Sequence, residues 1–81
     1  MNQNSEIQQL TPDQLRTIGI ALFGKGFKIQ LADYLGVDRR RINHWLDGDR
    51  PIPSDTGQKL LELVKVRSNE INNVMKMLES L

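Results

Sequence analysis

The stretch VDRRRINHWLDG, residues 37–48, runs from three consecutive arginines directly into large apolar side chains. On an α-helix that begins near Arg39, residues three and four positions apart share a face. One face then holds the apolar residues Ile42, Trp45 and Leu46. The opposite face carries Arg40 and His44. The pattern predicts a helix that Trp45 anchors to a core, while its basic side is presented, amino end first, to an anionic partner.

The residues on both sides of this stretch delimit two short helices. Asp38 is a good N-cap for the basic helix, and Gly48 with the two prolines of the following loop ends it. Before the turn, KIQLADYLG (residues 28–36) predicts a second amphipathic helix, which Gly36 stops in the left-handed conformation that glycine tolerates. The apolar positions of that helix are Ile29, Leu31, Ala32 and Leu35. The sequence therefore predicts a short helix, a tight turn and the basic helix in succession.

The stretch LTPDQL, which begins at Leu10, marks the start of an earlier helix. Thr11 and Gln14 form a capping box, and the proline between them fits the first helical position. Apolar residues then recur at helical spacing, so we expect this helix to cover about residues 12–23. The preceding residues, 1–10, are expected to form a flexible tail.

The sequence after the prolines predicts a long helix with a heptad pattern, beginning at Ser54 or Asp55. Its two columns are Leu60, Arg67, Val74 and Leu81 in one, and Val64, Ile71 and Leu78 in the other. Beyond Arg67 the apolar residues exceed what the core of the domain needs. We therefore predict a dimerisation surface made of Ile71, Val74, Met75 and Leu78. Two alternatives stay open: the helix folds back on the first helix, or Ser68 caps a separate last helix after a break near residues 66–69.

Composition limits the classes of protein that fit. The chain has 81 residues, a formal net charge of +1, one histidine and no cysteine, which indicates one small domain without disulfides or a metal site. No signal peptide and no membrane-spanning run is visible, so we expect a cytoplasmic protein without a membrane partner. No nucleophile–base pair is visible either, so we expect neither an enzyme nor a cofactor nor a small-molecule ligand. Six basic and four acidic residues lie between Lys25 and Arg50, a balance of +2 against −1 for the rest of the chain; the asymmetry is mild, but three of the basic residues are adjacent.

The spacing of residues across the turn resembles a known DNA-binding motif. Ala32 is small where the two helices approach, Gly36 allows the turn, and Ile42 fills the angle between the helices. Further core positions are Leu31, Leu35 and Trp45. This spacing resembles the helix-turn-helix of the lambda-repressor and Cro superfamily of prokaryotic and phage DNA-binding proteins, over about residues 12–66. The aromatic turn before the first helix of the motif, and the W–G–P pattern after its second, resemble small phage and plasmid members.

The resemblance implies an all-α, lambda-repressor-like bundle of four to five helices. It also implies that the helix over residues 39–47 enters the major groove of double-stranded DNA, and that Lys28 and Arg50 contact phosphates. The chain departs from many relatives at the start of the earlier helix, where it has Lys28 and Ile29 in place of Gln or Ser. That departure leaves the phosphate contact of Lys28 less well supported than that of Arg50.

The residue types on the basic helix predict how it reads DNA. Arginine can contact guanine O6 and N7 with both arms of its fork, and asparagine can pair with adenine. We predict base contacts from four residues: Arg39, Arg40, Asn43 and His44. We predict phosphate contacts from four others: Lys28, Tyr34, Arg41 and Arg50. The alternatives are a solvated charge run for the arginines, a phosphate or only water for Asn43, and a half-buried position for Tyr34.

Together these patterns predict a homodimeric transcriptional repressor that binds a palindromic operator. Residues 1–10 are the tail, residues 11–66 the DNA-binding domain and residues 67–81 the dimerisation helix. Phage Cro-like regulators and anti-CRISPR-associated repressors both fit this description. One alternative is an antitoxin-like or adaptor module whose last helix binds a different protein. Another is a phage DNA-binding subunit of the small-terminase type.

Overall fold

The computed structural model describes residues 9–81 and folds them into helices alone. These residues contain four α-helices and one 3-10 turn, and they form no strand. In chain order the elements are α1 (Pro12–Phe23), the 3-10 turn η2 (Gly24–Gly26), α2 (Phe27–Leu35), α3 (Arg39–Asp47) and α4 (Thr56–Glu79). The prediction of an all-α protein is confirmed. Between residues 9 and 81, no helix combines the length and the apolar character that crossing a membrane requires.

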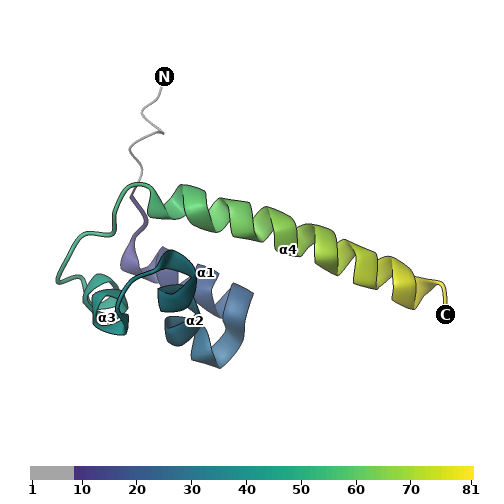
Figure 1. The fold of residues 1–81 in the computed structure, drawn as a ribbon, viewed down its shortest axis with the longest axis horizontal. Helices are drawn as coiled ribbons and strands as arrows, with labels where there is room; N and C mark the ends of the chain where they lie inside the picture. The colour runs from purple at the N-terminus through teal and green to yellow at the C-terminus, as the bar shows by residue number, and fades with distance from the viewer. Residues whose placement is uncertain (1–8) are drawn as a thin grey trace, which may run out of the picture.

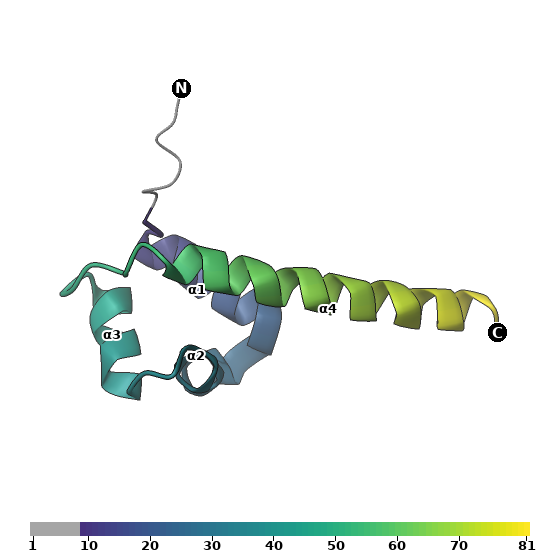
Figure 2. The ribbon, with the colours of Figure 1, turned by 45° about the horizontal axis from the view of Figure 1, so that its top comes forward.

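One core joins the helices, and the long α4 lies across it (Figure 1). The buried apolar side chains come from all four α-helices and from the loop before α4: Leu15, Phe27, Leu31, Ala32, Ile42, Trp45, Leu46, Ile52 and Leu60. Figures 1 and 2 both show that the second half of α4 extends beyond the other helices. They also place α3 at the opposite end of the molecule from the carboxyl end of α4.

The amino end of α1 is capped as the sequence predicts. The Gln14 N–H donates to the Thr11 hydroxyl (3.1 Å), and the Thr11 N–H donates to the Gln14 side-chain oxygen (3.0 Å). Leu10, which the prediction placed in the tail, packs partly buried against the core, and removing its apolar side chain from water is favourable. Residues 1–8 of the predicted tail lie outside the described residues.

Helices α1 and α2 approach each other at Gly19, which is buried within α1. A methyl group added there would overlap the ring of Phe27 and would lie 3.2 Å from Leu31 Cδ1. Phe27 is the first residue of α2, one position before the predicted start of that helix. The turn η2 leads directly into Phe27, so α1 and α2 are joined without an extended loop.

The turn between α2 and α3 has the geometry that its sequence predicts. Gly36 adopts φ 70° and ψ 35°, the left-handed region that favours glycine. The Asp38 carboxylate then accepts a backbone N–H from the first turn of α3 (2.8 Å) and so caps that helix. Ala32 and Ile42 are both buried where the resemblance expects the two helices to meet. The turn therefore fixes the direction of α3 relative to α2.

Helix α4 is unbroken, so the alternative of a break near residues 66–69 is wrong, and the predicted boundary after residue 66 falls inside a helix. Arg67, the one cation in the apolar columns, has a structural role that explains its position. Its guanidinium lies 5.7 Å from the centre of the Phe23 ring and donates to the Leu22 carbonyl oxygen (3.5 Å). Arg67 therefore ties α4 to the carboxyl end of α1. From residue 64 onward every side chain of α4 is exposed, so only its first half packs on the core.

Candidate nucleic-acid interface

Helix α3 is buried along one face and exposed along the other. Ile42, Trp45 and Leu46 are buried, as the sequence predicts. The four residues predicted to contact bases are all exposed: Arg39, Arg40, Asn43 and His44. Because three large apolar side chains anchor this helix of nine residues, its exposed side chains project from a fixed support.

A surface depression of about 350 Å³ lies on one side of this exposed face. It is formed by the turn η2, the first residues of α2 and the first half of α3. Its lining residues are Lys25, Gly26, Lys28, Ile29, Arg39 and Asn43. Lys28, predicted to contact phosphate, therefore lies beside two of the predicted base-contact residues.

A second depression, of about 280 Å³, lies on the other side of α3. Its lining residues are Asp38, Arg40, Arg41, His44 and Arg50. Arg50 reaches this side because the loop after α3 turns back: the Arg50 N–H donates to the His44 carbonyl oxygen (3.3 Å). The His44 Nδ1 atom also lies 3.7 Å from the carboxylate of Asp49, and both side chains are exposed.

The two depressions together collect six cationic side chains around α3: Lys25, Lys28, Arg39, Arg40, Arg41 and Arg50. Within residues 9–81, the ion pairs formed by basic side chains involve Arg16, His44, Lys59 and Arg67, and none of these six. The one carboxylate that lines either depression, that of Asp38, already accepts the backbone N–H of Arg40. These six side chains thus form no ion pair within residues 9–81, and with the four aspartates of residues 25–50 the segment keeps a formal balance of +2.

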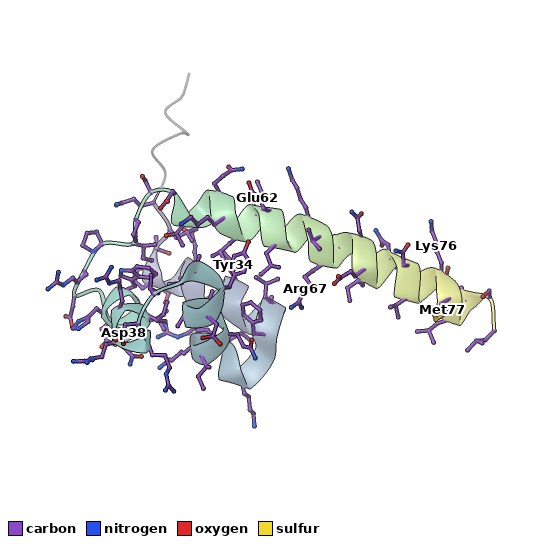
Figure 3. The ribbon with its side chains drawn as sticks, in the orientation of Figure 1. Tyr34, Asp38, Glu62, Arg67, Lys76 and Met77 are labelled. Atoms are coloured by element: carbon purple, nitrogen blue, oxygen red, sulfur yellow. The ribbon has the colours of Figure 1, made fainter. Side chains whose placement is uncertain are left out.

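Tyr34 lies away from this basic face. Its hydroxyl donates to the Lys59 carbonyl oxygen of α4 (2.8 Å), and Figure 3 shows the side chain between α2 and α4. The geometry thus assigns Tyr34 to the contact between those two helices. The prediction that Tyr34 contacts phosphate receives no support from this position, and Tyr34 is left out of the interface proposed below.

Two residues at the face were missed by the sequence analysis. Ile29 was placed only among the apolar positions of the second amphipathic helix, yet it is 49% exposed and lines the first depression. The buried residues of α2 are Phe27, Leu31 and Ala32, and Ile29 falls outside the stripe that they define. The offset becomes visible once Phe27 is known to begin the helix and to be buried. Lys25 was counted in the local charge but not assigned to the site, because nothing in the sequence shows how η2 folds beside α3.

Most of the groups that this face offers are hydrogen-bond donors. No cluster of three or more His, Cys, Asp or Glu side chains suited to a metal ion occurs within residues 9–81. Guanidinium, ammonium and amide groups bind phosphate oxygens and the edges of bases. No protein-family model, curated protein or solved structure matches this chain.

Proposed function

We propose that this protein is a sequence-specific regulator that binds double-stranded DNA, with α2 and α3 as a helix-turn-helix and α3 in the major groove. The observation that carries the proposal is the set of six cations, unpaired within the described chain, that flank the exposed face of an anchored helix. A surface of this kind matches the charge of a DNA backbone on both sides of a groove.

The proposed reading of DNA follows from the position of each side chain. The major groove is about 12 Å wide and admits an α-helix. With α3 in the groove, Arg39, Arg40, Asn43 and His44 face the base edges, where arginine reads guanine and asparagine reads adenine. The flanking cations then face the two phosphate backbones: Lys25, Lys28, Arg41 and Arg50. The resemblance to the lambda-repressor and Cro superfamily supports three parts of this proposal: α3 in the major groove, a phosphate contact from Lys28 at the start of α2, and one from Arg50 in the loop after α3.

The protein acts in this proposal as a homodimeric repressor. One short recognition helix reads only a few base pairs, so two copies related by a twofold axis are needed to specify an operator. The exposed apolar residues of α4 supply a surface for the second copy: Ile71, Val74, Met75 and Leu78. A dimer bound across a promoter blocks transcription by occupying the DNA.

Selection from a random double-stranded DNA library by the purified protein tests this proposal. We expect enrichment of a palindromic site. Arg40→Ala should weaken binding to that site by about 1–3 kcal/mol and binding to random DNA much less, because a base contact is lost. Arg16→Ala is the matched control, since Arg16 lies on α1 and pairs with Asp13 (3.7 Å). A failure to enrich any sequence, or an equal effect of the two substitutions, contradicts the proposal.

A further inference from the structure

The apolar face of α4 continues past the body of the protein. In the first half of the helix, Thr56 and Leu60 are buried against the other helices. At 100° per residue, the apolar residues of the second half continue on the same side. They are Ile71, Val74, Met75, Met77 and Leu78, and they are exposed. These side chains cover roughly 160° of the helix circumference, which is wider than the stripe that a single helix partner buries.

An apolar groove of about 410 Å³ lies beside this helix, between α4 and α1. The wall on α1 is formed by Ile18, Ala21 and Leu22, and the wall on α4 includes Val64 and Ile71. The groove sits next to the contact of Arg67 with the end of α1, beyond which α4 continues alone (Figure 3). Each chain therefore carries both an apolar groove and an unpaired apolar helix.

We propose that this groove receives the second half of α4 from a second copy of the chain, with the two α4 helices antiparallel. The inference deepens the homodimer of the proposed function by adding α1 to the interface. The groove and the unpaired half of α4 meet at Ile71, which belongs to both. An antiparallel pairing centred near Ile71 sets residues 71–81 of each copy against residues 61–71 of the other. Because one twofold axis relates the two copies, each groove receives the helix of the other copy. The dimer is then closed, and no third copy can add to it.

Charge and area both favour a second copy as the occupant. In the antiparallel pairing residue 79 lies opposite residue 63, so Glu79 of one copy comes within two residues of Lys65 of the other, whereas a parallel pairing sets Lys65 beside Lys65. If each of the five exposed apolar side chains in the second half of α4 contributes on the order of 100 Å², then α4 and the groove wall together bury on the order of 600 Å² per copy, the lower end of the range for stable interfaces. This pairing also accounts for the wide apolar arc of α4. One edge of the arc contacts α4 of the other copy, and the opposite edge contacts α1 of the other copy.

The proposed interface leaves the basic face free. The carboxyl half of α4 and α3 lie at opposite ends of the molecule in both views (Figures 1 and 2). A dimer formed through α4 and α1 therefore keeps both copies of α3 accessible. This separation allows the interface to be tested without DNA.

Cross-linking tests the inference directly, because the chain has no cysteine of its own. We expect an equimolar mixture of Ala21→Cys and Leu78→Cys proteins, oxidised mildly, to give mainly the mixed disulfide, identified by intact mass. Asn73→Cys is the control for Leu78→Cys, since residue 73 lies on the polar side of α4 and should not link to residue 21. The inference is overturned if Leu78→Cys proteins link only to each other, or if residues 73 and 78 link equally to residue 21.

A substitution in the groove wall gives an independent readout. Ala21 is exposed, so Ala21→Arg should leave the helical content of the chain intact, while the melting temperature falls because the association with the second copy is lost. Light scattering should show a monomer in place of a dimer, and Arg40→Ala should remain a dimer. If Ala21→Arg keeps the mass of the parent dimer, the groove inference is wrong while the DNA-binding proposal stands. If the cysteine variants cross-link as expected but the parent protein selects no DNA sequence, the proposed function fails and the interface stands.

Discussion

Gly19 and Gly57 are both helical glycines, yet their surroundings differ. A Cβ atom at Gly19 would overlap the ring of Phe27, whereas a Cβ at Gly57 would meet only Leu10, at an ordinary 3.9 Å. The close approach of α1 and α2 therefore depends on the absence of a side chain at Gly19. Gly57 has no comparable steric requirement.

Gly19→Ala is therefore expected to lower the free energy of unfolding by about 1–3 kcal/mol, the usual cost of forcing an extra methyl into a packed core. Gly57→Ala should be neutral or slightly stabilising, since alanine favours the helix more than glycine does. Thermal melts followed by circular dichroism measure both changes. If the melting temperature of Gly19→Ala equals or exceeds that of Gly57→Ala, then α1 and α2 can move apart without any loss of stability, and the prediction is wrong.

Helices α2 and α4 share the apolar core, and within residues 9–81 one side-chain hydrogen bond also joins them, from the Tyr34 hydroxyl to the Lys59 carbonyl oxygen. Tyr34→Phe removes the donor but keeps the ring. We expect the free energy of unfolding to fall by about 0.5–1.5 kcal/mol, with the lower value favoured because the site is partly exposed. Affinity for a selected DNA site should not change. A loss of affinity without a loss of stability would restore Tyr34 as a phosphate contact.

The elements differ in how much of them the sequence can predict. The start of α1 and the turn before α3 depend on neighbouring residues, through the Thr11–Gln14 capping box and Gly36, and both were predicted with their residues. The anchoring of α3 was predicted because Ile42, Trp45 and Leu46 share one face of a helix. These features are local, so local patterns suffice.

Features that depend on distant contacts were not predictable in the same way. Ile29 is apolar, and only the burial of Phe27 and Leu31 shows that the core stripe of α2 excludes it. The heptad pattern made Arg67 a misfit, because the contact with Leu22 and Phe23 is visible only once α4 is placed beside α1. Periodicity reveals which side of a helix is apolar, but not what covers it.

The distribution of charge over the molecule sets the salt dependence of DNA binding. If each subunit of a dimer neutralises about three to four phosphates, the slope of log K against log salt should be about −5 to −7. Substituting Lys28 and Arg50 by alanine should reduce the magnitude of that slope, because both lie at the edges of the basic face. Binding that hardly responds to salt would favour a protein partner over DNA.

The length of α4 also sets the distance between the two half-sites of the operator. Ile71 lies about 22 Å along the helix axis from Thr56, and α3 lies beyond the start of α4 in both views (Figures 1 and 2). With the twofold axis near Ile71, the two copies of α3 stand more than about 45 Å apart, which exceeds one turn of DNA at about 34 Å. We therefore expect half-sites about two turns apart to bind more tightly than half-sites one turn apart. Competition among operators that differ only in spacer length measures this preference, and a best spacing of one turn would place the twofold axis elsewhere.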